Sequence, residues 1–91
     1  CNVAIGFQPL FYNATGGYNV ALGGQALYSN KVGCNNNAMG KLTLYSNTSG
    51  HYNNAFGYYA LHKNTTGCHN NALGGNALYA NTTGCDNTLI Q

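Results

Sequence analysis

The sequence predicts an all-β fold, namely a β-solenoid (a β-roll or β-helix) with one 17-residue coil per repeat, two short parallel strands per coil and no helix. The first observation is the segment NNALGGNALYANTTGCD at residues 70–86, whose pattern also fills the four preceding 17-residue windows without insertion or deletion. A period below about 20 residues leaves room for one solenoid coil but not for a pair of helices. The second observation is that apolar runs are short and glycine recurs in every repeat, which disfavours helices.

The repeat covers the chain as a single domain, residues 1–91, without a linker or a change of composition. The predicted coils are residues 2–18, 19–35, 36–52, 53–69 and 70–86, followed by a partial sixth coil at 87–91. We number the repeat positions 1 to 17 from the leading asparagine. Solenoids usually end in atypical capping repeats. Here the pattern runs to both ends, which favours either a longer shaft or end-to-end stacking of molecules into a filament.

Each coil is expected to hold two extended segments and one turn. The first strand is predicted at N-x-A-Φ-G (positions 1–5, with Φ a bulky apolar residue), and the second at x-A-L-Y (positions 7–10). The glycine at position 5 separates the two strands, and the Asn-Thr-Thr-Gly run (positions 12–15) is typical of turns, since Asn and Gly tolerate positive φ.

Two bulky apolar columns are predicted to form the interior, from positions 4 and 9 of successive coils. The residues are Ile5, Leu22, Met39, Phe56 and Leu73, and then Leu10, Leu27, Leu44, Leu61 and Leu78. Because side chains alternate along a strand, the invariant alanine at position 3 is expected on the outer face. There it packs against a second chain or fits a tight corner. The asparagines at positions 1 and 12 are expected to stack amide on amide as ladders.

Charged residues are almost absent from the chain, which contains only Lys31, Lys41, Lys63 and Asp86. The lysines are scattered over different repeat positions, so the pattern predicts no nucleic-acid partner. No apolar run approaches the roughly 20 residues that span a bilayer, so no membrane span is predicted. A single carboxylate excludes paired acid–base catalysis, and the recurrent glycines are architectural. We therefore expect no enzyme activity and no cofactor.

Three of the four cysteines share position 16 of the repeat. Adjacent coils would bring Cys68 and Cys85 within disulfide range, at about 5 Å between Cα atoms. Cys34 is two coils from Cys68, so Cys1 and Cys34 are expected to be free thiols or to join other chains. The bridge implies an oxidising, extracellular setting. A metal site at Cys34, His51, Cys68 and Cys85 is disfavoured, because ligands in a line cannot surround one ion.

Four asparagines at position 12 lie in N-x-S/T sequons, namely Asn13, Asn47, Asn64 and Asn81. They would display glycans in one line along the rod, and the alternative is that asparagine serves only the turn. The second repeat keeps Asn30 without a sequon, which favours the turn as the primary role. Threonine columns at positions 13 and 14 raise ice binding as a further alternative, although Lys31 and Val32 interrupt them.

The segments Asn2–Gly6 (NVAIG) and Asn19–Gly23 (NVALG) resemble the head repeats of trimeric autotransporter adhesins. The fuller N-x-A-Φ-G-x-x-A-L-Y-x-N-T-T-G form is similar to repeats of phage tail-fibre and bacterial surface proteins. The resemblance spans the chain and implies an extracellular β-roll, often with three chains side by side, that serves as a stalk or adhesive head. The period here is longer than in the adhesin heads, and the cysteines and the aromatic column at position 10 are additional.

Together these patterns predict a structural protein of the cell or virion surface, a fibre, filament or shaft subunit. Its partner would be itself, end to end, as a side-by-side trimer, or both. The alternative is an adhesin or receptor-binding head whose tyrosine and asparagine columns contact glycans.

Overall fold

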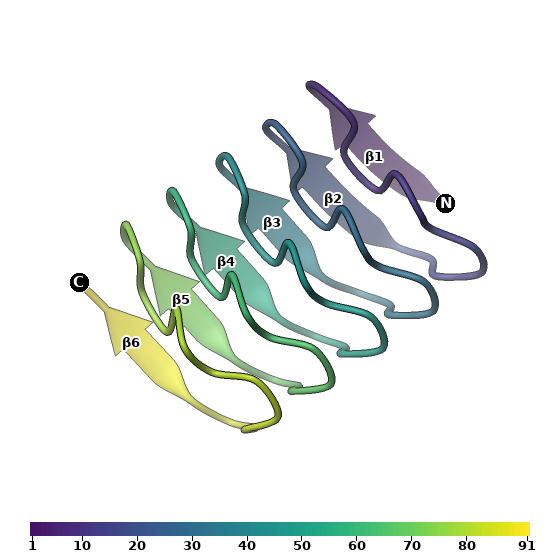
Figure 1. Cartoon of the computed structure of the whole chain (residues 1–91). Coiled ribbons are helices and arrows are strands. Elements are labelled where there is room, and N and C mark those ends of the chain that lie inside the picture. Colours follow the sequence, from purple (N-terminus) through teal and green to yellow (C-terminus); the bar gives the residue numbers. More distant parts are fainter.

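The computed structural model describes all residues, 1–91, and shows an all-β solenoid without a helix (Figure 1). Each coil contributes one strand to a single parallel sheet, and the strands are β1 (Asn2–Ile5), β2 (Asn19–Leu22), β3 (Asn37–Met39), β4 (Asn54–Phe56), β5 (Asn71–Leu73) and β6 (Thr88–Ile90). The strands follow one another in chain order across the sheet, so the two termini lie at opposite ends of the stack. The predicted fold class is confirmed.

The sheet register repeats the sequence register. Ala21 pairs with Ala38, and Ala38 pairs with Ala55, so each residue faces its equivalent 17 positions on. Parallel strands normally need a long crossover connection, and here the remainder of each coil supplies it. The molecule measures 28 × 21 × 16 Å along its principal axes. No helix in it is long and apolar enough to pass through a membrane.

The expected second strand of each coil is not present. Its residues at positions 7 and 9 have left-handed backbone angles, with φ of 62° at Leu42 and 49° at Leu44. A left-handed residue turns the chain, so this segment curls back over the sheet in place of running straight. Coil-to-coil bonding continues there nevertheless, since the N–H of Leu44 donates to the carbonyl of Ala60 at 3.1 Å. The prediction of two strands per coil was therefore wrong in this detail.

The interior is made from small residues and leucine. Its members share full burial and come from positions 3, 8 and 9: Ala21, Ala38, Ala55, Ala72, Ala26, Ala60, Ala77, Leu27, Leu44 and Leu61. Leu10 and Leu78 are partly buried and pack against this cluster. The predicted leucine column is thus confirmed as core.

The predicted bulky column at position 4 lies on the outside of the sheet, and that prediction was wrong. Met39 is 40% exposed in the middle of the stack, and Ile5 is 64% exposed. Leu22, Phe56 and Leu73 are half-buried. Burial in β2 alternates, with Asn19 and Ala21 inside. Since the coil is thin, the interior beside position 3 is filled by alanine, and the bulky residue at position 4 points outward.

Two buried asparagine ladders complete the interior, as predicted. At position 12, Nδ2 of Asn47 donates to Oδ1 of Asn30 at 2.8 Å, and Nδ2 of Asn64 donates to Oδ1 of Asn47 at 2.9 Å. At position 1, the backbone N–H of Asn53 donates to Oδ1 of Asn36 at 3.0 Å. No buried side-chain nitrogen or oxygen lacks a hydrogen-bond partner. The core therefore contains amides at little desolvation cost.

Glycine at position 15 is required by close approach between coils. A Cβ built on Gly50 would collide with the carbonyl oxygen of Gly67 and with Oδ1 of Asn47. The carbonyl oxygen of Gly50 itself accepts two hydrogen bonds, one from Nδ2 of Asn36 at 2.8 Å and one from Nδ2 of Asn47 at 3.2 Å. Both ladders therefore converge on this glycine, which explains why positions 1, 12 and 15 are invariant among the repeats.

Candidate functional site

The outer face of the sheet carries side chains from positions 2 and 4. Position 4 gives an unbroken apolar column along the stack, consisting of Ile5, Leu22, Met39, Phe56, Leu73 and Ile90. Position 2 begins with two valines and continues as an asparagine ladder, in which Nδ2 of Asn37 donates to Oδ1 of Asn54 at 2.7 Å. Nδ2 of Asn54 in turn donates to Oδ1 of Asn71 at 2.8 Å. The sheet thus presents an apolar stripe beside a neutral polar stripe.

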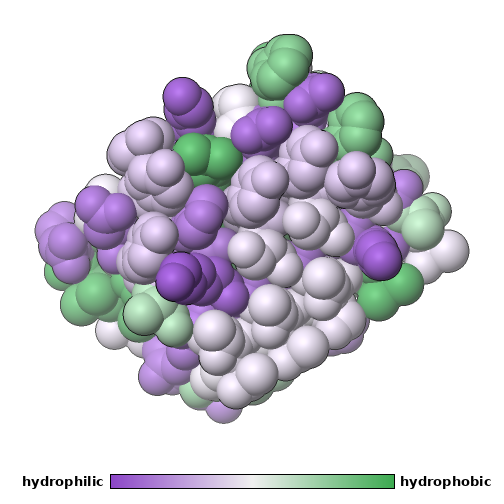
Figure 2. Space-filling model, viewed as in Figure 1, coloured by the Kyte–Doolittle hydropathy of each residue, from purple (hydrophilic) through white to green (hydrophobic).

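In the viewing direction of Figure 1, the molecular surface is mostly of intermediate hydropathy (Figure 2). Strongly hydrophilic and strongly hydrophobic residues are scattered there and do not gather into one patch. This agrees with a chain of which only 4% of residues are charged.

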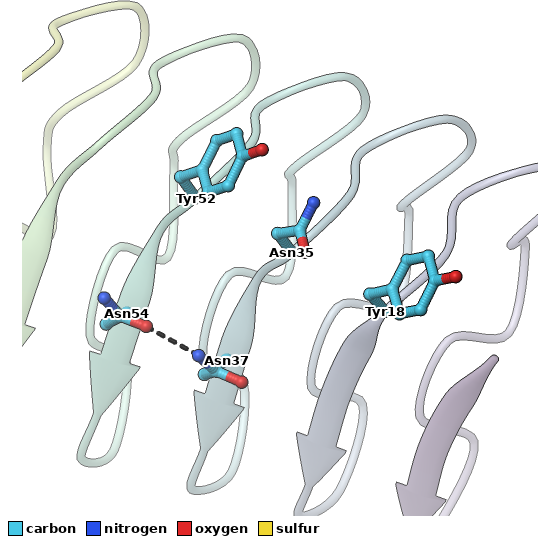
Figure 3. A pocket seen from close by; sticks show the side chains of 5 residues that line it. All are labelled: Tyr18, Asn35, Asn37, Tyr52 and Asn54. Atoms are coloured by element: carbon cyan, nitrogen blue, oxygen red, sulfur yellow. Dashed lines mark hydrogen bonds between the residues drawn. The ribbon is translucent and has the colours of Figure 1, made fainter.

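An open groove of about 420 Å³ lies beside the asparagine stripe, lined by Tyr18, Asn35, Asn37, Tyr52 and Asn54. Tyr18, Asn35 and Tyr52 occupy position 17 of three successive coils and project from the same side of the stack (Figure 3). The two tyrosines are exposed, and the shorter Asn35 leaves a gap between their rings. Sequence reasoning missed this groove, although the order Tyr, Asn, Tyr at position 17 was its visible signal.

The aromatic column at position 10 forms a continuous stack. Neighbouring rings of Phe11, Tyr28 and Tyr45 lie 5.0–5.2 Å apart at their centroids, with planes within 5°. His62 takes the place of a tyrosine in this stack, 5.3 Å from Tyr45 and 5.3 Å from Tyr79. Partial burial, and to a smaller extent the neighbouring side chain of Tyr12, raise the pKa of Tyr28. Because each ring covers its neighbour, this column offers edges to a ligand and few open ring faces.

Cys68 and Cys85 lie side by side on adjacent coils as thiols, with 2.8 Å between their Sγ atoms. The hydrogen bond to Cys85 raises the pKa of Cys68, with smaller contributions from partial burial and from the charges of Cys85 and Asp86. The sulfurs are thus placed for the predicted disulfide. Cys34 lies elsewhere in the column, where its Sγ donates to the carbonyl of Val32 at 3.3 Å, and Cys1 is exposed.

The histidines do not assemble a metal centre with the cysteines. His51 accepts from the N–H of Cys34 through Nδ1 at 3.3 Å, and His69 stacks on Tyr52 at 5.0 Å between ring centroids. No group of three or more His, Cys, Asp or Glu side chains is close enough to hold one ion.

The sequon asparagines are core residues. Asn47 and Asn64 have no exposed surface, and their Nδ2 atoms, to which a glycan would attach, donate to the neighbouring asparagine and to a glycine carbonyl. Asn13 and Asn81 are partly buried in the same ladder. A glycan on Asn47 or Asn64 would break these buried hydrogen bonds, so the structure disfavours glycans at these two positions, and glycans at Asn13 and Asn81 stay a prediction. The alternative that asparagine serves the coil itself accounts for the position.

The threonine columns are partly committed to the backbone. The hydroxyl of Thr48 donates to the backbone carbonyl of Thr65 at 3.3 Å, and the hydroxyl of Thr65 donates to the backbone carbonyl of Thr82 at 3.2 Å. Lys31 and Val32 interrupt both columns in the second coil, where both are exposed. This turn therefore offers no continuous array of free hydroxyls that would favour ice binding.

Comparison with known proteins adds no relative to this description. No family model matches the chain, and no curated protein and no solved structure matches it either.

Proposed function

We propose that this chain is a structural shaft segment that works outside the cell and associates side by side with further copies of itself through the apolar stripe at position 4. The single observation that carries the proposal is the position of this stripe. Its residues are large and apolar in every repeat, but they lie on the outside of the coil, where Met39 is 40% exposed. A continuous apolar stripe on the outer face of a regular sheet, exposed at Ile5, Met39 and Ile90, marks an interaction surface.

A second copy is the occupant that fits the stripe best. The side chains recur once per coil, at about the 4.8 Å spacing of parallel strands, and another copy of the chain carries the same spacing. The near absence of charge also means that two such faces meet without like-charge repulsion. Two or more copies could therefore repeat the same stripe-to-stripe contact at every coil, in an isologous or cyclic homo-oligomer.

The area available suggests that association strengthens with length. Four residues at about 3.3 Å each give a face roughly 13 Å wide. Over a stack 28 Å long this is on the order of 360 Å² per chain. Stable interfaces bury about 800 Å² per partner. A longer run of coils would supply the difference, as a shaft requires.

The test is the mass of the protein in solution, measured by multi-angle light scattering during size exclusion. We expect an assembly larger than the 9.6 kDa chain, and we expect its mass to fall when Met39 and Phe56 are both changed to serine. The matched control is Val32→Ser, which removes an exposed apolar side chain from the turn. A wild-type protein that remains monomeric at about 100 µM, while a duplicated ten-coil chain does the same, would contradict the proposal.

Negative-stain electron microscopy of the same samples separates two forms of the shaft. Filaments would indicate end-to-end joining in addition to lateral association, whereas discrete rods would indicate lateral association alone.

A further inference from the structure

We propose that the groove between Tyr18 and Tyr52 is a binding site for one neutral pyranose ring of a glycan. The ring would enter above Asn35, with its C–H faces against the two tyrosines and its hydroxyl edge toward the asparagine amides. This inference is independent of lateral association, because the groove is formed by coils of one chain.

The spacing of the coils sets the width of the gap. Tyr18 and Tyr52 occupy equivalent positions two coils apart, which corresponds to about 9.6 Å along a parallel sheet. A ring placed midway would lie about 4.8 Å from each tyrosine, within the range at which rings stack in proteins. Adjacent rings of this molecule adopt the same separation, for example 5.0 Å between Tyr52 and His69. A ligand ring would therefore fill the place left by the missing aromatic side chain at Asn35.

The ring faces that bound this gap are open, unlike those of the column at position 10. Tyr52 stacks on His69 with one face only, and its other face looks toward Asn35. Tyr18 is 70% exposed and Tyr52 is 53% exposed, although His69 covers one face of the Tyr52 ring. Binding needs no side chain to be displaced from either face.

The polar groups at the groove favour a sugar over an aromatic ligand. The side chain of Asn35 makes no hydrogen bond within the chain. Asn37 donates through Nδ2 to Asn54, but its Oδ1 accepts none, because Val20 at the same position of the preceding coil has no side-chain donor. These amides offer both donors and acceptors to hydroxyl groups. All five lining residues are neutral, so a neutral hexose suits the groove better than a phosphate or a sialic acid.

Saturation-transfer NMR with methyl glycosides of glucose, galactose and mannose, each at about 50 mM, tests the proposal, because an open site for one ring is expected to bind on the order of millimolar. We expect transfer from the protein to the ring C–H protons of at least one glycoside. Absence of transfer from all three would overturn the proposal. Transfer to phenol without transfer to any glycoside would also overturn it, because the site would then recognise aromatic rings.

The deciding variant is Asn35→Tyr, which puts a ring into the gap. Tyrosine is tolerated at this position of the repeat, where Tyr18 and Tyr52 have φ of 60° and 57° and Asn35 has 59°. We expect the variant to fold and to lose at least tenfold in affinity. Asp86→Tyr introduces a tyrosine at position 17 of a coil outside the groove, although it also removes a negative charge, and should keep binding. Unchanged binding by the Asn35→Tyr variant would overturn the proposal, and circular dichroism on both variants checks that they fold.

Discussion

Nδ2 of Asn64 lies 2.9 Å from Oδ1 of Asn47 in the preceding coil, and neither side chain has any exposed surface. The same nitrogen donates to the carbonyl of Gly67 at 3.1 Å. Both hydrogens of the amide are therefore used, one between coils and one within the coil. A shift of the coil register would separate these partners and leave buried amides unpaired, so the ladder fixes the stacking register.

Because both amide hydrogens of Asn64 are used, we expect an isosteric substitution that removes them to lower the stability of the fold strongly. Asn64→Asp replaces the donor by an oxygen that faces two acceptors, Oδ1 of Asn47 and the carbonyl of Gly67. We expect the free energy of unfolding to fall by about 3 kcal/mol or more at neutral pH. Urea unfolding followed by circular dichroism measures this change.

The same variant should become less unstable as the pH falls. Burial raises the pKa of a carboxyl group in the folded state above its unfolded value of about 3.9. The folded state therefore binds the proton more tightly, and the penalty shrinks as the pH falls toward that value and grows as the pH rises. Asn76→Asp is the control, since Asn76 is exposed and has a left-handed φ of 61° that aspartate tolerates. Equal effects of the two substitutions would argue against a buried ladder.

Neighbouring residues of β4 should differ in how strongly the protein's stability depends on the size of their side chains. Ala55 is fully buried in the thin interior, whereas Phe56 is half-buried on the outer face. Ala55→Leu should lower the free energy of unfolding by about 1–3 kcal/mol, because the interior has no room for added carbons. Phe56→Leu should change the stability of the isolated coil stack by less than about 1 kcal/mol. Thermal unfolding of both variants at one protein concentration decides between this arrangement and its inverse.

Expression in a host that attaches N-linked glycans should leave Asn47 and Asn64 unmodified in folded protein. Their Nδ2 atoms are buried and each donates two hydrogen bonds, so a glycan there would prevent the coil from closing. Peptide mass spectrometry before and after glycosidase treatment measures the occupancy. A glycan on Asn64 in material that retains its circular dichroism spectrum would show that the ladder is not needed.

The fold could be predicted from the sequence because a fixed 17-residue period allows few architectures, and the asparagine ladders followed from invariant Asn at equivalent positions. The inside and outside of the strand could not be assigned from side-chain size. The larger residue of the pair Ala55 and Phe56 was expected inside, but the thin coil admits only the smaller. The better signal was invariance, since position 3 is alanine in every complete repeat while position 4 varies in shape.

The groove required the structure for a related reason. Its residues Tyr18 and Asn37 belong to repeat positions 17 and 2 of different coils, and their proximity depends on which way each strand faces. The left-handed backbone of Leu44 was likewise hidden, because leucine rarely adopts positive φ and does so here to reach the core while the chain curls. Local preference was overridden by burial at this position.

Oxidation of the purified protein should link Cys68 to Cys85, whose sulfurs lie 2.8 Å apart. Cleavage after the three lysines separates the pair in one peptide, residues 64–91, from Cys34 in residues 32–41 and Cys1 in residues 1–31. We expect the peptide 64–91 to lose two hydrogens, and we expect the closed loop of about 17 residues to stabilise the protein by about 3 kcal/mol. In the reduced protein, the hydrogen bond to Cys85 raises the pKa of Cys68, so less thiolate is present at a given pH. The rate of Cys68 alkylation should therefore rise at higher pH than in a Cys85→Ala variant. A dominant link between residues 32–41 and 64–91 would contradict the coil register, because Cys34 and Cys68 are two coils apart.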